Sequence, residues 1–329
     1  MIEEGSDATM ESDELQACAV SALDNYGLAE CPLTLLNNLK NASFHVENSS
    51  GSANYGSANY ALRLSKPGLR SVSEVEAELV WLRHLAVLSN SKVPYPVQTM
   101  NGADHFAIRS GSGECRIGVL FEWVEGEFLS EELTERHVTM AGGLLGVLHD
   151  AGQQWTPPSG FARPTFDYDR LLGDTLPKEE VLRLGDRSLF RDVEDMARDL
   201  FGQLTRGPET FGLIHGDFQN GNYLFDGVGV NVIDFDDFGF GFFAYDVAIA
   251  LRNLKVIPEY ASLAAAFLRG YMNAFPTAII DESTLSRLMA IRRLSITYWL
   301  GSFWQNEKSK EWLPWYVAKT IDELRFHIS

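Results

Sequence analysis

The pattern of hydrophobic and polar positions changes about a third of the way along the chain. In residues 14–28 the apolar side chains recur at helical spacing, which predicts an amphipathic helix. Short stretches of β character at 43–47, 60–64 and 117–123 each predict a strand. Between the first two strands the segment SSGSANYGSANY is rich in Ser, Gly and Asn, and it predicts a long loop.

Helical patterns dominate after residue 125. One helix is also predicted within the strand-rich part, at 73–88, where Ser73 followed by Glu76 fits a capping box. The change of pattern predicts an α+β fold with two lobes. The expected boundaries are a flexible acidic tail at 1–12, a small β-rich lobe at 13–124 and a larger helical lobe at 125–329.

Charge excludes some classes of partner. The 329 residues include 45 acids and 27 bases, and the formal net charge is -18. A chain with this much negative charge repels nucleic-acid phosphates and anionic lipid. We therefore expect no nucleic-acid partner and no membrane partner. A cationic ligand would suit it better, although acidity can also serve solubility alone.

The sequence also gives an expectation about location. No run of ~18 apolar residues occurs, the acidic N-terminus has no apolar signal region, and the three cysteines are scattered. We therefore expect a cytoplasmic protein, acting as a monomer or a homodimer.

The polar residues with the clearest chemical pattern lie between positions 215 and 246. Asp217 follows a short apolar run at 211–214, which predicts a strand, and Asn222 comes five residues later. Two further apolar runs, at 223–225 and 231–233, flank a turn that contains Asp-Gly, which predicts a β-hairpin. A hairpin returns the chain to its origin, so it would place Asn222 beside Asp234.

This set of residues suits phosphoryl transfer. The reaction needs a carboxylate that accepts the proton of the attacking hydroxyl, and oxygen ligands that hold Mg²⁺ against the phosphates. Asp217 fits the first role, and Asn222 and Asp234 fit the second. The alternative is that the three residues only cap turns, which Asp and Asn often do. That alternative does not explain why a hairpin would bring them together.

The motifs HGDFQNGN and IDFDD resemble the catalytic loop and the metal-binding Asp of the aminoglycoside phosphotransferase and choline kinase-like superfamily. The resemblance implies a bilobal protein-kinase-like fold, ATP and Mg as cofactors, and transfer of the γ-phosphate to a hydroxyl group. Gly216 stands where protein kinases often carry Arg, and no APE motif follows IDFDD. Both departures resemble the small-molecule kinase branch. After IDFDD the chain passes into FGFGFFAYDVAIAL, which predicts a helix. Asp246 matches an acid usual in this superfamily, which implies a structural role, and Asp236 and Asp237 are expected to be supporting or solvated residues. The likeness covers about residues 14–325 in coarse form, with specific motifs only at 215–246.

The resemblance also implies a nucleotide-binding set in the first lobe. Arg63 takes the place of the usual strand lysine, with Glu78 as its partner and Glu74 or Glu76 as alternates. An Arg at this position resembles a subgroup that includes stress response kinase A and type II homoserine kinase. A guanidinium can bridge a phosphate and a carboxylate. The remaining implied contacts are Ser43 or Asn41 to the phosphates, and the Glu122 carbonyl and Val124 amide to adenine.

Three functions stay open at this point. The first is a kinase acting on a hydroxyl of an amino alcohol, amino acid, sugar or aminoglycoside-like molecule. The second is a protein Ser/Thr kinase of the stress response kinase A type, and the third is a nucleotide-binding pseudokinase, against which the intact Asp217, Asn222 and Asp234 argue. The acidic run over 122–135 has two interpretations: it binds a cationic acceptor, or it is a face exposed to solvent. Five late aromatic residues favour an ammonium cage or a core, namely Trp299, Trp304, Trp312, Trp315 and Tyr316.

Overall fold

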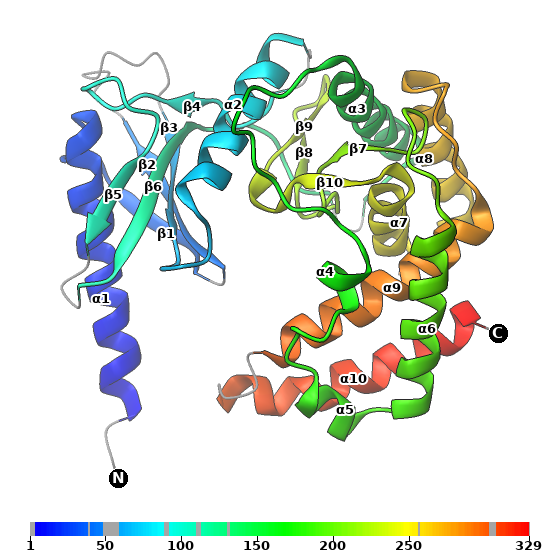
Figure 1. The fold of residues 1–329 in the computed structure, drawn as a ribbon. Helices are drawn as coiled ribbons and strands as arrows, with labels where there is room; N and C mark the ends of the chain where they lie inside the picture. Colours follow the sequence, from blue (N-terminus) through cyan, green and yellow to red (C-terminus); the bar gives the residue numbers. More distant parts are fainter. Residues whose placement is uncertain are drawn as a thin grey trace. The chain divides into compact units, whose positions relative to one another are not determined.

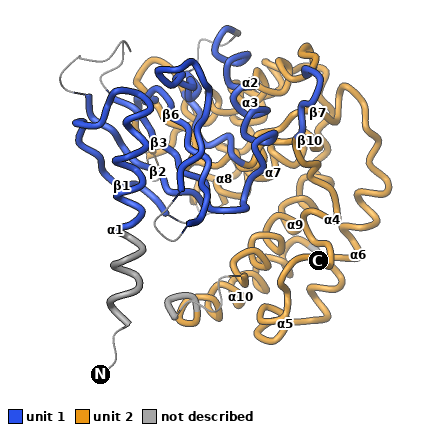
Figure 2. The backbone as a smooth tube through the Cα atoms, turned by 60° about the vertical axis from the view of Figure 1, so that its left-hand side comes forward, with its two compact units in different colours: residues 1–126, 157–162, 231–236 blue, residues 127–156, 163–230, 237–329 orange. Residues whose placement is uncertain are grey.

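The described part of the chain divides into two compact units, which Figure 2 shows in different colours. The computed structural model describes residues 4–38, 40–48, 59–88, 92–109, 113–129, 132–255, 257–302 and 307–328. The sequence suggested one boundary near residue 125; the first division falls between Gly126 and Glu127. Two later segments, 157–162 and 231–236, also belong to unit 1, which no sequence pattern indicates.

One antiparallel sheet and two long helices make up most of unit 1 (Figure 1). Its elements are α1 (Glu4–Leu23), η1 (Asp24–Tyr26), β1 (Leu33–Asn38), β2 (Asn41–Glu47), β3 (Asn59–Ser65), α2 (Val72–Leu88), β4 (Pro96–Val97), β5 (Phe106–Arg109) and β6 (Cys115–Glu122). The strands follow the order β1-β2-β3-β6-β4, and β5 also pairs with β6. This confirms the predicted strands and shows an α+β arrangement.

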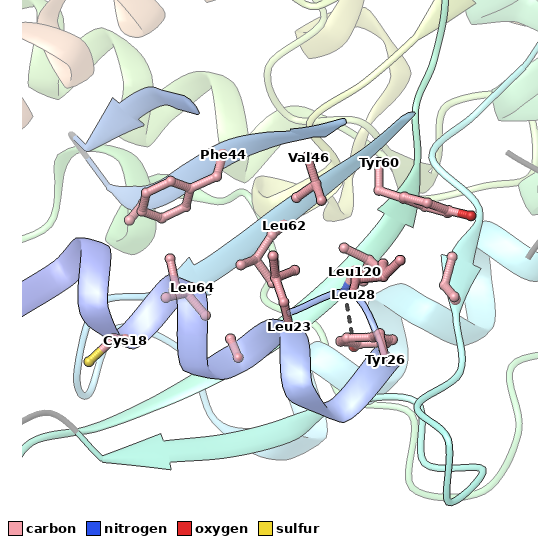
Figure 3. Packing of buried hydrophobic residues seen from close by; sticks show 14 of the residues in the cluster. Cys18, Leu23, Tyr26, Leu28, Phe44, Val46, Tyr60, Leu62, Leu64 and Leu120 are labelled. Carbon is pink, nitrogen blue, oxygen red and sulfur yellow. Dashed lines mark hydrogen bonds between the residues drawn. The ribbon is translucent and has the colours of Figure 1, made fainter. Parts of the chain in front are cut away.

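The helix α1 covers one face of this sheet. Leu23 of the helix belongs to the same buried cluster as Phe44 of β2 and Leu62 of β3 (Figure 3). The hydroxyl of Tyr26 accepts a hydrogen bond from the amide of Leu120 at 3.2 Å, which ties η1 to β6. Burial of these apolar side chains stabilises unit 1 on this side.

Two details of unit 1 differ from the sequence-based expectation, and a third expectation is not tested. The backbone is helical from Glu4, so most of the predicted acidic tail belongs to α1. The α2 capping box forms at Ser71 and not at Ser73: the Ser71 hydroxyl accepts from the Glu74 amide at 3.2 Å, and the Glu74 carboxylate accepts from the Ser71 amide at 2.9 Å. Both serines fit the same four-residue pattern, so the pattern could not choose between them. The predicted long loop lies outside the described residues up to position 58.

The segment 231–236 is fixed to unit 1 through its first residues. The side chain of Asn231 accepts from the Lys92 amide at 2.8 Å and donates to the Glu125 carbonyl at 3.0 Å. The Val232 amide donates to the Lys92 carbonyl at 3.2 Å. These bonds explain why a late part of the chain belongs to the first unit.

Unit 2 is mostly helical (Figure 1). Its elements are α3 (Glu135–Gln154), α4 (Tyr168–Leu172), α5 (Glu179–Leu184), α6 (Arg187–Gln203), β7 (Phe211–Ile214), β8 (Tyr223–Phe225), β10 (Gly239–Phe242), α7 (Phe243–Leu254), α8 (Tyr260–Ala274), α9 (Glu282–Gly301) and α10 (Glu307–Ile328). The strand β9 (Val230–Val232) forms a two-stranded sheet with β8, as the predicted hairpin required. Asp226 closes the turn by accepting from the Gly229 amide at 2.7 Å.

Helices α3 and α8 touch through their backbones. A Cβ atom at Gly142 would collide with the Phe267 carbonyl, and one at Gly270 would collide with the Thr139 carbonyl. The Thr139 hydroxyl also donates to the Ala266 carbonyl at 3.2 Å. Glycine at these positions therefore permits the close contact.

The sequence misassigned the segment FGFGFF. It was expected to start a helix, but residues 239–242 form strand β10, which pairs with β7 in antiparallel register, and α7 starts only at Phe243. The alternation of glycine and phenylalanine is a period of two, which is the periodicity of a strand.

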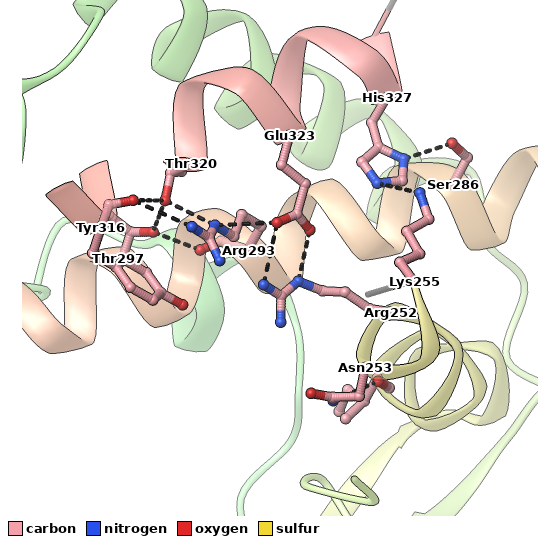
Figure 4. Close-up of polar contacts among 11 residues, drawn as sticks. Arg252, Asn253, Lys255, Ser286, Arg293, Thr297, Tyr316, Thr320, Glu323 and His327 are labelled. Atoms are coloured by element: carbon pink, nitrogen blue, oxygen red, sulfur yellow. Dashed lines mark hydrogen bonds and ion pairs between the residues drawn. The ribbon is translucent and has the colours of Figure 1, made fainter. Parts of the chain in front are cut away.

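A polar network ties α10 to α7 and α9 (Figure 4). Glu323 accepts from Arg252 at 2.8 Å, and its other oxygen lies 3.4 Å from Arg293. His327 lies 2.9 Å from both Lys255 Nζ and the Ser286 hydroxyl. Burial and the neighbouring Lys255 lower the pKa of His327 to about 4, so the ring is neutral at pH 7.

The late aromatic residues do not form the expected Trp-rich core. Trp299 and Trp312 are half-buried and Trp315 is 63% exposed, while Trp304 lies outside the described residues. Tyr316 stacks against the chain's own Arg293, whose guanidinium carbon lies 4.1 Å from the ring centre. No described helix combines the length and apolar character that a membrane crossing requires.

Candidate active site

The loop that carries Asp217 connects β7 to β8 in unit 2. Its second residue, Gly216, has φ of 79°, in the left-handed region. A Cβ atom there would lie 2.6 Å from the Phe166 ring and 2.9 Å from the Asp237 carbonyl. Glycine therefore satisfies both the conformation and the space that this turn allows.

A buried carboxylate fixes the backbone of this loop. Asp246, in the first turn of α7, accepts from the His215 amide at 2.6 Å and from the Gly216 amide at 2.8 Å. His149 Nε2 lies 3.2 Å from the same carboxylate, and its Nδ1 lies 2.9 Å from the Tyr271 hydroxyl. Burial lowers the pKa of His149, so the ring is neutral, donates to Asp246 and accepts from Tyr271. Asp246 has the structural role that the family resemblance implied.

The carboxylate of Asp217 is surrounded by donors. Asn222 Nδ2 donates to the Asp217 carbonyl at 2.9 Å and to its carboxylate at 3.1 Å. Gln219 donates to the same carboxylate oxygen at 3.1 Å. Arg292 of α9 forms an ion pair with the other oxygen. The side chain of Asp217 therefore has a fixed orientation, which a proton acceptor needs.

The same contacts orient Asn222. Both of its bonds to Asp217 use Nδ2, the donor end of the amide. The oxygen Oδ1, which is the amide atom that binds hard cations, takes no part in them. Assignment of the two amide atoms follows from this hydrogen-bond network.

Sequence reasoning missed Arg292 and Gln219. Gln219 lies inside the quoted motif HGDFQNGN, so its position was visible although its contact was not. Arg292 lies 75 residues from Asp217, and no local pattern connects the two. The signal available was a pair of arginines within the apolar helix sequence LMAIRRLSI, because an arginine in such surroundings usually has an acidic partner.

In unit 1 Arg63 and Glu78 form the expected ion pair. Two parallel bonds of 2.7 Å join the guanidinium to the carboxylate, whose side chain is only 2% exposed. The alternates have other partners: Glu74 caps α2, and Glu76 lies 3.3 Å from His105 near the surface. Because side chains alternate along a strand, Arg63 points to the sheet face opposite α1, toward α2.

A second fork lies at the start of α2. Arg70 donates to both oxygens of Asp236, at 3.2 and 3.0 Å. We expected Asp236 to be a supporting or solvated residue. In the structure it is buried and paired with Arg70. Burial alone would lower the pKa of Arg63, but the carboxylates of Glu78, Asp236 and Asp234 raise it above its usual range. These carboxylates therefore make an acidic environment around Arg63.

Asp234 stands out by its backbone. Its φ is 63°, and among the described residues it alone has a positive φ without being glycine. Aspartate tolerates this region better than most residues, although the conformation is still unfavourable. The carboxylate of Asp234 is exposed, so a ligand can reach it.

The other candidate nucleotide contacts also lie in unit 1. Ser43 of β2 is directly opposite Arg63 in the sheet register, so the two side chains share one face. Glu122 ends β6, where its amide donates to the Tyr95 carbonyl at 2.9 Å, and Val124 follows as a buried residue. Asp217 and Asn222 belong to unit 2 and Asp234 to unit 1, so the meeting of Asn222 and Asp234 stays a prediction.

The candidate residues have a coherent chemistry within each unit. In unit 2 a fixed carboxylate can accept a proton, and an amide oxygen is oriented for a cation. In unit 1 a buried guanidinium fork can bind phosphate, and an exposed carboxylate can bind a metal ion. Carboxylate and amide oxygens are the ligands that hard divalent cations such as Mg²⁺ and Ca²⁺ prefer.

Comparison with known proteins gives consistent matches. A family model described as the phosphotransferase enzyme family matches residues 35–279. Amicoumacin kinase from Bacillus subtilis (strain 168) is 26% identical over 233 residues, which cover 69% of this chain and 66% of that protein. The chain thus matches slightly less than two thirds of that relative's length.

Solved structures agree with the bilobal kinase-like fold. The structure of the microcompartment-associated aminopropanol kinase has a TM-score of 0.77 and 28% identity, covering 93% of this chain and 95% of that one. An amicoumacin kinase in complex with AMP-PNP, Ca²⁺ and Ami has a TM-score of 0.75, covering 97% of this chain and 96% of that one. Its identity is 20%, so this second likeness concerns the fold alone.

Proposed function

Because the chain belongs to the phosphotransferase enzyme family, we propose that it is an ATP-dependent kinase of a small molecule that carries a hydroxyl group. The observation that carries this proposal is the contact between Asp217 and Asn222. A proton acceptor and an oriented amide oxygen form one hydrogen-bonded unit there. Phosphoryl transfer needs these two groups side by side, because the attacking hydroxyl and the metal-bound phosphate must meet.

In this proposal Asp217 orients the acceptor hydroxyl and takes its proton. Gln219, Asn222 and Arg292 hold the carboxylate in one orientation, so little reorganisation is needed when the acceptor binds. Asp246 stabilises this arrangement because it fixes the backbone of the loop that carries Asp217.

Asn222 Oδ1 and the Asp234 carboxylate would hold the metal ion. Both are hard oxygen donors, and their number leaves room for phosphate oxygens and water, as is usual for Mg²⁺. When bound, the ion would neutralise charge on the β- and γ-phosphates. The complex of the related kinase fold with AMP-PNP and Ca²⁺ supports the use of a nucleotide and a divalent metal.

The nucleotide would bind to the residues of the first lobe, residues 13–124. Arg63, fixed by Glu78, would contact the phosphates, and Ser43 lies on the same sheet face. The Glu122 carbonyl and the Val124 amide would meet the adenine edge. The helical lobe, residues 125–329, would bind the acceptor. We also propose a cytoplasmic location, because three scattered cysteines are typical of a reducing compartment.

We further propose that the acceptor carries an amine. The chain's net charge of -18 favours a cationic ligand. The named relatives include an aminopropanol kinase, whose name describes an amino alcohol. An acceptor with an amine would be positively charged at neutral pH.

A coupled ADP-release assay with Mg·ATP tests the proposal. The acceptors would be 1-amino-2-propanol, ethanolamine, choline, homoserine, an aminoglycoside, methylthioribose and a generic protein. We expect turnover with an amine-bearing alcohol and a loss of about 10²–10⁴-fold in Asp217→Asn, because the proton acceptor is removed. The matched control is Asp199→Asn, an exposed carboxylate on α6, which should keep full turnover.

A thermal-shift titration with Mg·ATP separates the alternatives. Both variants should keep the nucleotide-induced shift, because neither change touches the proposed nucleotide contacts. A shift without turnover on any acceptor would favour the pseudokinase. Turnover on the generic protein alone would favour the protein kinase, and absence of both signals would contradict the site assignment.

A further inference from the structure

Two arginine–carboxylate forks attach helix α2 to other parts of unit 1. In the middle of the helix Glu78 binds Arg63 of β3 through two bonds of 2.7 Å. Directly before the helix Arg70 binds Asp236 through bonds of 3.2 and 3.0 Å. The Arg70 and Asp236 side chains are only 9% and 5% exposed. Bidentate pairs of this kind fix direction as well as distance.

The second fork lies next to the proposed metal ligand. Asp236 follows Asp234 by two residues, and the turn between them contains the buried Phe235. A left-handed φ of 63° at Asp234 is unfavourable for a residue with a Cβ and persists only where its neighbours hold it. The anchored Asp236 and Phe235 supply such a hold on one side.

The position of Arg70 is itself set by the start of α2. Ser71, the next residue, forms the capping box with Glu74. One nitrogen of Arg70 also lies 3.9 Å from the Glu74 carboxylate. A continuous set of contacts therefore runs from the helix start through Arg70 and Asp236 to Asp234.

We infer that Arg70 is a positioning residue for the metal ligand Asp234 and acts through Asp236. The helix α2 then fixes the phosphate-binding Arg63 by one fork and the metal-binding segment by the other. This inference rests on the proposed function, since it assigns a role toward the metal of that site. No local sequence pattern indicates this role, because 166 positions separate Arg70 from Asp236.

Loss of Arg70 would also disturb the charges around Arg63. The carboxylate of Asp236 already acts on Arg63 electrostatically, together with Glu78 and Asp234. Without Arg70, Asp236 would be a buried carboxylate that has lost this fork and still interacts with the charge of Arg63. The hold on Asp234, two residues away, would then be weaker.

The test is a titration of the full chain with Mn²⁺, followed by electron paramagnetic resonance, in the presence of AMP-PNP. We expect Arg70→Ala to weaken Mn²⁺ binding about 10-fold to 100-fold, as is typical when a group that orients a metal ligand is removed. Binding of AMP-PNP without metal should change much less. This contrast would not follow from a general loss of stability.

Unit 1 offers a matched control. Arg83 binds Asp104 through two bonds of 2.8 and 2.7 Å, in the same unit but with no part in the proposed site. Arg83→Ala should leave Mn²⁺ affinity unchanged. Arg70→Lys, which keeps the charge but loses the fork, should bind Mn²⁺ with an intermediate affinity.

If Arg70→Ala folds poorly, a double-mutant cycle with milder variants still tests the inference. Asp236→Asn should weaken Mn²⁺ binding as much as Arg70→Ala does, and the double variant should be no weaker than either, because the two residues act as one pair. Mn²⁺ affinity at the unmodified level in Arg70→Lys and Asp236→Asn would overturn this inference alone. Failure of the unmodified chain to bind Mn²⁺ with AMP-PNP would overturn the proposed function itself, and this inference with it.

Discussion

The loop of Asp217 and the segment of Asp234 are held by different means. In unit 2 the loop is held by its backbone, because Asp246 accepts from two consecutive amides. In unit 1 the segment is held mainly by side chains, namely Asn231 at its start and the Arg70–Asp236 fork at its end. One arrangement depends on a single buried acceptor, and the other depends on contacts at both ends of the segment.

The difference indicates how each half should respond to change. Backbone anchoring makes the loop depend most strongly on Asp246, while the His215 ring adds one further bond by accepting from the Asp217 amide at 3.3 Å. Side-chain forks distribute the attachment of α2 over two pairs, so one weakened fork leaves the other. The forks depend on the planar guanidinium, which lysine cannot replace.

The strongest test of the comparison is Asp246→Ala. The change leaves two buried amides without an acceptor, at about 1–3 kcal/mol each, so we expect a loss of about 2–6 kcal/mol in the free energy of unfolding. Urea denaturation of the full chain would measure it. Asp246→Asn keeps the shape and one acceptor oxygen and should lose less. Equal stability of Asp246→Ala and the unmodified chain would mean that the loop does not depend on this residue.

A smaller effect is expected from Arg63→Lys. The charge beside Glu78 is kept but the fork is lost, which should cost about 1.5–3 kcal/mol, the range for a hydrogen bond to a charged group. The same variant should weaken nucleotide binding, measured by isothermal titration, while Arg83→Lys should leave it unchanged. A fully stable Arg63→Lys with normal affinity would show that charge alone suffices in unit 1.

The smallest expected effect on stability concerns the polar network that attaches α10 to α7 and α9. This network is a third way in which a segment of the chain is held. His327 has a pKa of about 4 in the folded chain, below the usual 6.5, since burial and Lys255 disfavour its charged form. Arg252 acts in the same direction, and Glu323 opposes it. The unfolded chain therefore takes up the proton first, so this residue lowers stability as pH falls from about 6.5 toward 4.

The matching measurement is the urea midpoint of the unmodified chain and of His327→Gln between pH 7 and pH 4. Other groups titrate in this interval in both proteins, so the difference between the two curves isolates His327. We expect the variant to lose less stability on acidification. Parallel curves would contradict a depressed pKa at this site.

Short sequence patterns predicted the strands and turns that depend mainly on neighbouring residues. The strands β7 and β8 were predicted with their bounds, because each is a short apolar run ended by residues that favour turns. The strand β10 was predicted as a helix, since its four residues were read together with the apolar helix that follows. Ser71 and Ser73 could not be distinguished, because both fit the same capping pattern.

The candidate site was predictable only as far as its residues are close in sequence. Asp217 and Asn222 were found together because one loop carries both. Arg63 and Glu78, only 15 positions apart, were paired on the strength of the family resemblance. Arg292 was missed because its contact with Asp217 depends on the packing of α9, which no short pattern encodes.

The division of unit 1 among three stretches of chain has a consequence for its synthesis. Arg70 leaves the ribosome 166 residues before its partner Asp236. At about 5–20 residues per second, that separation corresponds to roughly 8–33 s of translation. During this interval the nascent first unit lacks the segment 231–236 and the second fork of α2. Ribosome-bound chains stopped before residue 236 should therefore expose the Arg70 side chain, and a protease that cuts after arginine should cleave there until the segment has emerged.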